Sequence, residues 1–400
     1  MKFSTIIRED LCAGCGLCEA FGNKMIIDHN GYLRPGDITF KNKNDESIIE
    51  SVCPGYLTYV KKTNENISYH RDSVWGDYIK IYKAYSSDSE IRYKGSSGGV
   101  ITSLLKYALE SKYADAAIVT LSDKENPILN RSICTDEINE IVNAISSRYS
   151  PSSPLSQLDT YLQQKKRIIL VGKPCDITAY KNLESLKPKL KEKVVLTISF
   201  LCAGVPSIKG TQQIIRDFNL DIDNVSSIKY RGDGCPGYFT LKTKDNKINR
   251  LSYNDSWGKV LNKYLQKRCK ICPDGTGEAA DIACGDIWEE RNGKPVFDNL
   301  EGYSLAILRS KKGVDFFKQA VGKDAVRIDS GVKVKYLKKI QPYQVDRRTF
   351  LFARYLGMVL SFRKIPKYDK KRFFKFFFIS PKRFTGVFFK TFLKSVKSEL

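Results

Sequence analysis

The chain contains 400 residues, a length that predicts two or three compact domains. Hydrophobic residues make up 42% of it, which excludes an intrinsically disordered protein, and no apolar run approaches the roughly 20 residues of a membrane-spanning helix. The formal net charge is +23, and eleven cysteines accompany only two histidines. Any metal centre must therefore be held mainly by sulfur.

The cysteines indicate ligands, not disulfides. Residues 1–16 contain no apolar segment followed by a small-residue cleavage site, so we expect a cytoplasmic protein in a reducing compartment, where disulfides are rare. Several cysteines stand in close pairs and triplets, which is how thiolate ligands are arranged. Soft thiolates favour zinc or iron–sulfur clusters.

The first motif is the run CAGCGLC over residues 12–18, followed at a distance by a Cys-Pro pair. C-x2-C-x2-C spacing wraps a compact loop around one face of a cubane, and a remote cysteine before proline supplies the fourth ligand in bacterial ferredoxins. A structural zinc site is the alternative, although zinc ribbons use paired C-x2-C motifs. The sequence predicts one [4Fe–4S] cluster held by Cys12, Cys15, Cys18 and Cys53.

From about residue 79 short apolar runs alternate with segments of helical periodicity. This alternation predicts an α/β fold, α+β overall, in which a small ferredoxin-like domain precedes a mixed, largely parallel sheet flanked by helices. The predicted strands are 79–86, 115–121, 167–172, 194–201 and 304–310, and the predicted helices are 100–111, 137–145, 156–164 and 210–218.

Residues 95–99, GSSGG, follow the first of these strands and open a helix. Small residues let the backbone approach a ligand, and free amides at a helix N-terminus attract a phosphate or a flavin. The alternative is a glycine-rich turn that only starts the helix. The spacing is neither that of a Rossmann G-x-G-x-x-G site nor that of a Walker motif.

A second group of cysteines is dispersed. Two of them follow neighbouring predicted strands, in GKPC and in SFLCAG, and a C-x2-C pair lies at 269–272. Cysteines at the ends of neighbouring parallel strands can meet a C-x2-C pair on a nearby loop, which would form a second cluster. The alternative interpretation is a set of buried free thiols, since cysteine is among the most buried residue types. The cysteines concerned are Cys175, Cys202, Cys269 and Cys272. We expect the isolated ones to be structural, namely Cys134, Cys235 and Cys284.

Residues 225–255 are rich in turns and predict hairpins inserted into the sheet, and 257–267 predict a helix. The end of the chain is different. Residues 361–400 hold 12 Lys or Arg and 2 acidic residues, a net charge of +10, together with ten of the 21 phenylalanines. This segment suits an anionic membrane surface. A tail that packs its Phe face on the protein itself, or a nucleic-acid arm, are the alternatives.

Six segments together resemble the beta subunits of the coenzyme F420 hydrogenase/dehydrogenase family. They are KGSSGGVITSLLKYALE, SSRYSPSS, GKPCDITAYKNL, FLCAGVPS, YRGDGCPGYFTL and RCKICPDGTGEAADIACGDIW, and the resemblance covers residues 80 to about 310. It divides the chain into a 4Fe-4S ferredoxin-type domain (1–70), the family's N-terminal, flavin-binding part (80–160), its C-terminal part (161–345) and a basic Phe-rich tail (346–400).

The resemblance also implies cofactors and site residues. It implies FAD and a second [4Fe–4S] cluster on Cys175, Cys202, Cys269 and Cys272. It assigns no role to Asp281 or Asp286, and Cys235 stands where relatives usually have tryptophan, which predicts a different substrate side of the flavin. The residues that fall on flavin-facing stretches are Ser97, Gly98, Gly99, Ser147, Arg148, Tyr149, Lys173 and Pro174.

These features predict an oxidoreductase that passes electrons between an acidic ferredoxin-like donor, two [4Fe–4S] clusters and FAD to reduce a small or lipid-linked substrate. The alternative is an electron-transfer subunit that reduces or oxidises coenzyme F420 or a partner enzyme. A zinc-dependent nucleic-acid binder is a third class, and we expect no nucleic-acid partner. No catalytic acid or base can be named, and the tail predicts a peripheral position at the inner face of the membrane.

Overall fold

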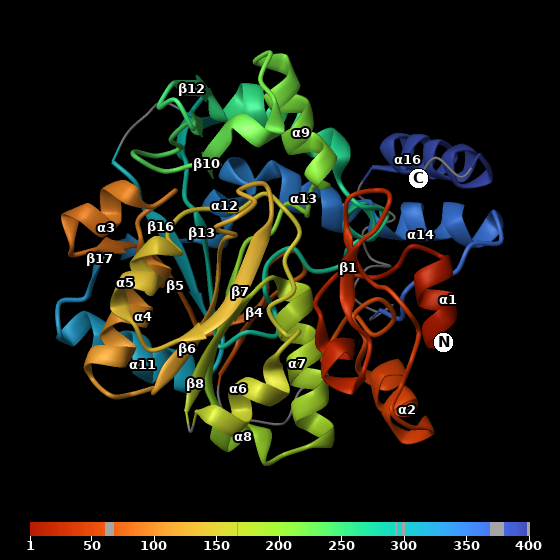
Figure 1. Ribbon diagram of the computed structural model, residues 1–400, viewed down its shortest axis with the longest axis horizontal. Coiled ribbons are helices and arrows are strands. Elements are labelled where there is room, and N and C mark those ends of the chain that lie inside the picture. The colour runs from red at the N-terminus through yellow and green to blue at the C-terminus, as the bar shows by residue number, and fades with distance from the viewer. Residues whose placement is uncertain (61–67, 166, 293, 298–300, 369–379, 398–400) are drawn as a thin grey trace.

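The computed structural model describes residues 1–60, 68–165, 167–292, 294–297, 301–368 and 380–397 (Figure 1). Within these ranges an eight-stranded sheet forms the centre of the molecule, in the order β17-β5-β16-β13-β9-β8-β6-β7. Its strands are β5 (Lys80–Ser86), β6 (Ala116–Ser122), β7 (Asn130–Thr135), β8 (Ile168–Gly172), β9 (Val194–Phe200), β13 (Ile282–Asp286), β16 (Ser304–Leu308) and β17 (Val326–Gly331).

The middle of this sheet is parallel. Strands β13, β9, β8 and β6 are parallel neighbours, and the remaining pairs are antiparallel. The predicted mixed, largely parallel sheet is confirmed. The carboxyl ends of the four parallel strands meet at one edge, which is where open α/β sheets place their ligands.

Helices cover both faces of the sheet because its strands are apolar on both sides. In β8, Ile168 and Leu170 join one hydrophobic core, whereas Ile169 joins the other. On the side of Ile169 lie α4 (Val100–Glu110), α5 (Ile138–Asn143) and α11 (Lys311–Gly322), with α3 (Ser89–Lys94) beside them (Figure 1). The opposite face carries α6 (Leu158–Gln164), α7 (Pro174–Leu186) and α8 (Leu190–Lys193).

The N-terminal unit, residues 1–60, lies beside α7 (Figure 1). Its apolar side chains, such as Phe3 and Ile49, belong to the same core as Ile177 and Tyr180 of α7, so the unit is packed against the sheet domain. It contains α1 (Phe3–Arg8), η1 (Leu17–Phe21), β1 (Met25–Ile27), β2 (Leu33–Pro35) and α2 (Lys43–Val52), and a hairpin of β3 (His70–Asp72) and β4 (Gly76–Tyr78) leads into the sheet.

The turn-rich insertion forms an antiparallel sheet of β10 (Val225–Lys229), β11 (Phe239–Thr243) and β12 (Ile248–Leu251), which packs with α9 (Ile208–Asp217) around a core of its own. A short η2 (Ile222–Asn224) precedes it. The predicted continuous helix at 257–267 is wrong. The chain there forms η3 (Asn254–Gly258), η4 (Leu261–Tyr264) and α10 (Lys267–Lys270), because Leu265 is extended and forms a β-bridge with Pro206.

The C-terminal part begins with the hairpin of β14 (Glu289–Arg291) and β15 (Lys294–Val296) and continues, after β16, α11 and β17, into helices. These are α12 (Val334–Ile340), α13 (Pro342–Thr349), α14 (Leu351–Leu360) and α16 (Pro381–Val396). Residues 369–379 and 398–400 of the predicted basic tail lie outside the described residues. No helix within the described ranges is long and apolar enough to cross a membrane.

Asp281, for which the sequence assigned no role, connects three elements. Its carboxylate accepts hydrogen bonds from the Thr197 amide (2.9 Å) and hydroxyl (2.7 Å) in β9 and from Ser310 (2.6 Å) at the start of α11. Burial alone would raise the pKa of Asp281, but Lys181, Lys312 and these hydrogen bonds hold it below its ordinary value of 3.8. Asp281 is therefore a charged structural residue.

We expect Asp281→Asn to lower the free energy of unfolding at pH 7 by about 2–3 kcal/mol, because it removes a buried, hydrogen-bonded charge. A carboxylate with a depressed folded-state pKa stabilises the fold above its unfolded pKa, and this contribution is lost as the pH falls through the folded pKa. The difference from the wild type should therefore shrink below about pH 4. Urea unfolding at both pH values measures it. Asp245→Asn, at an exposed site, is the control, and a pH-independent difference would contradict the assignment.

Candidate cofactor and metal site

The first cysteine set lies on one tight loop and one helix end. Gly14 and Gly16 have φ of +70° and +83°, a left-handed conformation that lets the loop fold around its own sulfurs, and Cys53 caps the end of α2. The four cysteines are buried and surround a small space together with Phe3, Met25 and Ile49. The structure therefore brings together the predicted ligands Cys12, Cys15, Cys18 and Cys53.

Burial and neighbouring sulfurs together raise the pKa values of three thiols in this set. Burial raises the pKa of Cys15 and Cys18 well above the ordinary value, and the neighbouring cysteines raise it further. For Cys53, burial and then the nearby Cys12 raise the pKa to about 12. Without a cation these sulfurs would stay protonated. A metal-bound cluster supplies the positive charge that lets all of them ionise.

The second cysteine set draws on three parts of the chain. Cys175 is the second residue of α7, directly after β8, and Cys202 lies two residues beyond β9. Cys269 and Cys272 come from α10 and the turn after it, and the Cys202 amide donates to the carbonyl of Gly275 (2.9 Å) in that turn. Burial raises the pKa of Cys175 and Cys202, and each is raised further by other members of the set.

Two donors point at a sulfur of this set. The Val205 amide and the Gln266 side-chain amide both lie 3.3 Å from Cys269 Sγ. Amides directed at sulfur stabilise the negative charge of a bound iron–sulfur cluster. Within the described residues, no group of three or more His, Cys, Asp or Glu converges closely enough to ligate a single metal ion. The first set instead encloses a space, which fits a four-iron cluster with one thiolate at each corner.

A cavity of about 520 Å³ opens beside the second set, at the carboxyl ends of the parallel strands. It reaches from Gly172 of β8 past Cys202 to Asp286 of β13. A cavity of this size suits a cofactor or a small ligand. Gly98 and Pro174 are not among its lining residues. The predicted flavin-facing residues that do line it are Ser97, Gly99, Ser147, Arg148, Tyr149 and Lys173.

The GSSGG segment starts α4 at the wall of this cavity. Gly99 has φ of +71° and is the N-cap of the helix, and the start of α4 lines the cavity together with Ser96 and Ser97. Hydrogen bonds of 2.9 Å join the Ser96 and Ser147 hydroxyls and the Ser97 and Ser304 hydroxyls. Gly98 has a packing role: a Cβ there would lie 2.6 Å from the Ser304 amide.

Arg148 lies in the cavity wall, but its guanidinium is directed into the protein. It donates to Asn130 Oδ1 (2.8 Å) and to the Ile228 carbonyl (3.0 Å), and it lies over the ring of Tyr230. Burial lowers the pKa of Arg148. The side chain therefore connects β7 to the insertion, and its neighbour Tyr149, which packs against Trp257, presents an aromatic ring to the cavity.

Arg231 is the central side chain of the cavity wall, and the sequence did not single it out. It is 2% exposed, forms a 2.8 Å ion pair with Asp286 and also donates to the Pro236 carbonyl (3.0 Å). Burial alone would lower its pKa, but Asp286 raises it. Asp286, for which the sequence offered no role, is thus the counter-charge of Arg231, and the rings of Tyr253 and Trp288 cover the guanidinium.

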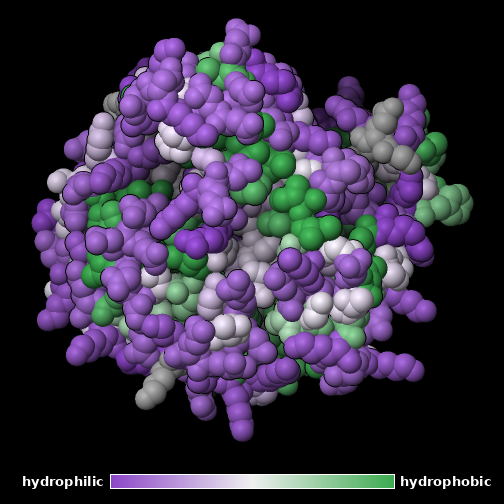
Figure 2. All heavy atoms as spheres, viewed as in Figure 1, coloured by the Kyte–Doolittle hydropathy of each residue, from purple (hydrophilic) through white to green (hydrophobic). Residues whose placement is uncertain are grey.

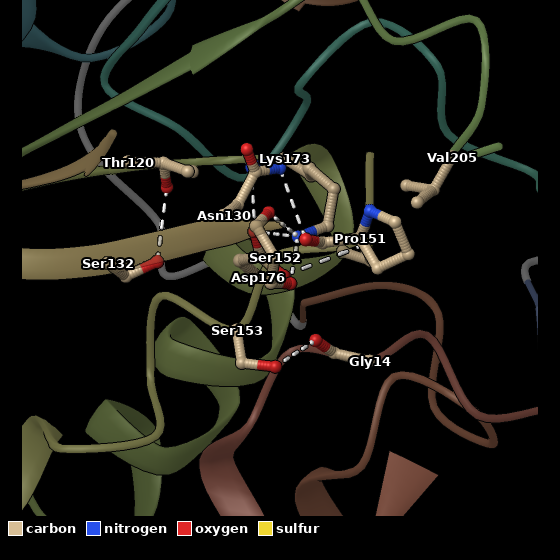
Figure 3. A network of polar contacts seen from close by, with 12 residues as sticks. Gly14, Thr120, Asn130, Ser132, Pro151, Ser152, Ser153, Lys173, Asp176 and Val205 are labelled. Carbon is tan, nitrogen blue, oxygen red and sulfur yellow. Dashed lines mark hydrogen bonds and ion pairs between the residues drawn. The ribbon is translucent and has the colours of Figure 1, made fainter. Parts of the chain in front are cut away.

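Lys173 links the cavity to the N-terminal unit. Its ammonium pairs with Asp176 (2.9 Å) and donates to the Ser152 carbonyl (2.9 Å) and hydroxyl (3.0 Å), as Figure 3 shows. Burial would lower the pKa of Lys173, but Asp176 holds it above the ordinary value, so the side chain is charged. Ser153, from the same segment, donates to the Gly14 carbonyl (3.0 Å) in the first cysteine loop.

The carbonyl of Cys202 is held from the other side by α13. Arg347 Nη1 (3.0 Å) and Gln344 Nε2 (3.1 Å) both donate to it, and Arg347 Nη2 also donates to the Ala203 carbonyl (2.6 Å). Arg347 and Gln344 are buried, and the sequence offered no signal for either, because α13 lies far along the chain from Cys202. They fix the backbone of the second cysteine set.

The three isolated cysteines have no cysteine neighbours among the principal causes of their pKa shifts. Burial raises the pKa of Cys134 to about 11 and that of Cys235 and Cys284 to about 12. Cys284 lies on β13 and lines the cavity. Cys235, in the turn after Arg231, packs near Gly302. Their role as structural thiols stays a prediction.

A sheet that is parallel at its centre, with a cavity at the carboxyl ends of those strands, is typical of ligand-binding α/β proteins. The family that matches the chain is coenzyme F420 hydrogenase/dehydrogenase: the N-terminal part of its beta subunit matches residues 81–159, and the C-terminal part matches residues 165–333. The chain belongs to this family and is an oxidoreductase. Both matched regions contribute strands to the same central sheet. Residues 1–80 precede both ranges, so the ferredoxin-type N-terminal domain stays a prediction.

Relatives of the chain are named as oxidoreductases or their subunits. The chain is 24% identical to the coenzyme F420-dependent sulfite reductase of Methanocaldococcus jannaschii over 86% of its own length, and it spans 51% of that protein. It is 25% identical to the coenzyme F420 hydrogenase subunit beta of Methanosarcina barkeri, an alignment that covers 68% of this chain and 86% of that protein. It is 23% identical to the F420-dependent formate dehydrogenase subunit beta of M. jannaschii, and the alignment covers 66% of this chain and 71% of that protein.

A solved structure shares the fold. A chain of the F420-reducing [NiFe] hydrogenase complex from Methanosarcina barkeri superposes with a TM-score of 0.57 at 22% identity, over 74% of this chain and 98% of that chain. The likeness supports the α/β architecture derived above.

We expect the Arg231–Asp286 pair to be strongly coupled, because one partner is fully buried and removal of either leaves the other unbalanced. A double-mutant cycle with Arg231→Met and Asp286→Asn should give a coupling free energy of about 2–3 kcal/mol by urea unfolding. The exposed ion pair of Lys259 and Asp255 is the matched control and should show no measurable coupling. Additive effects at Arg231 and Asp286 would show that the pair does not organise the cavity wall.

Proposed function

We propose that the chain is an iron–sulfur flavoprotein that carries electrons between a ferredoxin-like protein and a small substrate in the cavity. The observation that carries this proposal is the position of Cys202, which belongs to the second cysteine set and also lines the cavity. A redox centre on these sulfurs would lie directly beside a bound flavin. The family membership supports an electron-transfer role.

Two four-iron clusters and FAD fit the residues present. Eight cysteines lie in two sets of four, and the cavity offers aromatic walls, small residues at a helix start and buried cations. When bound, cubane clusters carry one electron each and a flavin exchanges a hydride or single electrons. The residues that would hold the clusters are Cys12, Cys15, Cys18 and Cys53 for the first and Cys175, Cys202, Cys269 and Cys272 for the second.

The remaining residues position and shield the cofactors. Tyr149 and Trp257 exclude water from one side of the cavity, and Tyr253 and Trp288 do so around Arg231. The α4 N-terminus presents free amides, which favour the negative charge of a phosphate. Lys173, neutralised by Asp176, holds the backbone of Ser152 between the cavity and the first cysteine loop.

A group of cations next to the second cysteine set supports an acidic protein partner. Lys267 and Lys270 flank Arg268 and Cys269 in α10. Partial burial lowers the pKa of both lysines; for Lys267 the nearby Glu9 raises it and Arg363 lowers it, and for Lys270 Lys394 lowers it further. Four cations therefore gather where α10 meets the ends of α14 and α16. Such a surface would attract an acidic electron donor.

A second candidate is favoured by the names of the relatives, several of which are subunits of F420-dependent enzymes. In this version the chain exchanges electrons with coenzyme F420 or with a partner enzyme and has no substrate of its own. The cavity and both cysteine sets would serve either function. The two versions differ in what exchanges electrons with the flavin: a substrate of the chain's own in the first, and coenzyme F420 or a partner enzyme's centre in the second.

The cluster ligands are tested by iron content. Anaerobically purified protein should contain about eight irons, from two clusters of four, and one releasable FAD. Cys15→Ser should lose roughly half of the iron and keep the flavin, because only the first set is broken. Cys134→Ser, at an isolated half-buried cysteine, is the matched control and should keep all of the iron. Full iron in the Cys15 variant, or zinc in place of iron, would rule out the assignment.

As a further part of the proposal, helices α14 and α16 attach the protein to an anionic membrane surface. Helices α14 and α16 touch through small residues: a Cβ on Gly357 would lie 2.9 Å from the Phe388 carbonyl, and Thr391 is buried at the same contact. Phe384 of α16 is buried against Phe352, but other large apolar side chains of this helix face outward, with Phe389 59% and Leu393 56% exposed. Figure 2 shows hydrophobic atoms at this edge of the molecule.

Such an exposed apolar face is unusual for a water-soluble helix pair, which buries most of its large apolar residues. It suits helices whose apolar face enters the lipid boundary while cations meet the headgroups. Exposed cations flank the apolar face on the same helix: Lys382, Arg383, Lys390, Lys394 and Lys397. Because residues 361–400 carry a net charge of +10, we propose that the surface they bind is one of anionic lipid.

We expect the double variant Phe389→Ser, Leu393→Ser to lose sedimentation with vesicles that contain anionic lipid, and to keep the wild-type unfolding temperature, because both side chains are exposed. The control is Ile248→Ser, at an exposed apolar residue 57% accessible on the insertion. Vesicles of neutral lipid should bind the wild type much less. Unchanged sedimentation, or a dimer-to-monomer change in gel filtration, would assign the surface to protein contacts.

A further inference from the structure

Arg268 is a buried cation without an acidic partner. The residue is 3% exposed. Among the residues that the structure describes, no Asp or Glu oxygen forms an ion pair with its guanidinium. Arginine stays protonated in proteins, and an unbalanced charge in the interior costs several kcal/mol. The fold must therefore supply negative charge to Arg268 from another source.

The position of Arg268 shows where that charge comes from. Its Nη2 (2.8 Å) and Nε (3.3 Å) atoms donate to the carbonyl of Pro54, the residue after Cys53 of the first set. Arg268 itself directly precedes Cys269 of the second set. Arg268 therefore belongs to the chain of the second set and is hydrogen-bonded to the chain of the first.

Two other buried arginines, Arg34 and Arg231, have an acidic partner, and a third, Arg347, contacts one cysteine set only. Arg34, beside the first set, has Asp10 at 2.7 Å, and Arg231 has Asp286 at 2.8 Å. Arg347 donates to the carbonyls of Cys202 and Ala203, and so faces the second set alone. Arg268 differs from these arginines because it contacts both sets. It donates hydrogen bonds to Pro54, next to Cys53 of the first set, and it directly precedes Cys269 of the second set.

We propose that Arg268 is a positioning residue that acts as the shared counter-charge of two iron–sulfur clusters and stabilises the reduced form of both. The inference rests on the proposed function. Four thiolates give each cluster a net negative charge, and reduction makes it more negative by one. A fixed cation nearby favours the reduced state of a cluster and so raises its reduction potential. The hydrogen bonds from Arg268 to Pro54 also fix the position of the first set relative to the second.

The test compares a neutral and a charge-conserving variant in the full-length holoprotein. Arg268→Gln keeps a donor for Pro54 but loses the charge, and Arg268→Lys keeps the charge. Iron content is measured first, and an anaerobic redox titration followed by electron paramagnetic resonance then gives the potential of each cluster. We expect the neutral variant to lower the reduced-to-oxidised ratio of both clusters at least tenfold at fixed potential, which is about 59 mV for one electron. The lysine variant should stay within about threefold of the wild type.

Each outcome decides the inference. If the glutamine variant assembles both clusters with unchanged potentials, or if one cluster shifts and the other does not, Arg268 is not a shared counter-charge. If the glutamine variant fails to take up iron, the lysine variant decides: near wild-type potentials support the charge, and loss of iron there as well assigns Arg268 a packing role. Absence of iron from the wild-type protein would instead overturn the proposed function.

Discussion

The crowding of eight cysteines in two sets, five of them buried and three half-buried, is the constraint on which the rest of the structure depends. Thiolates at this density repel one another, and burial raises the pKa of Cys15 and Cys175 far above the ordinary value, so ionised sulfurs need compensating positive charge. The fold supplies it at several points. Arg268 and Arg347 are both buried beside the sets, which is where a cluster's negative charge would be located.

The parallel centre of the sheet brings this chemistry to one place. Cys175 and Cys202 follow neighbouring strands β8 and β9, so they emerge at the same edge at which the cavity opens. The N-terminal unit is attached to that edge by hydrogen bonds, since Ser153 and Leu155 both contact the first cysteine loop. A protein bound near the first set would thus lie close to both sets and, through Cys202, to the cavity. Cysteines that are far apart in the sequence are thus brought to the same edge of the sheet.

Much of this architecture could be predicted from local sequence. Apolar runs marked β5, β6, β8, β9 and β16, and the C-x2-C-x2-C spacing marked the first set, because both signals depend on residues near one another in the chain. Long-range partners gave no such signal. Arg231 finds Asp286 only through the fold, Gln344 reaches Cys202 from α13, and Leu265 breaks the predicted helix at 257–267 because it bridges to Pro206. Arg148, expected to face a flavin, is instead bonded to backbone carbonyls across the cavity wall.

The central claim is that electrons reach the cavity by way of the cysteine sets. The most direct test follows bound-flavin absorbance after mixing with reduced ferredoxin or with a reduced deazaflavin, in the wild type and in Cys175→Ser. The account predicts that ferredoxin bleaches the flavin of the wild type but not that of the variant, whereas a small reductant that enters the cavity bleaches both. Equal bleaching of the variant by ferredoxin would contradict it.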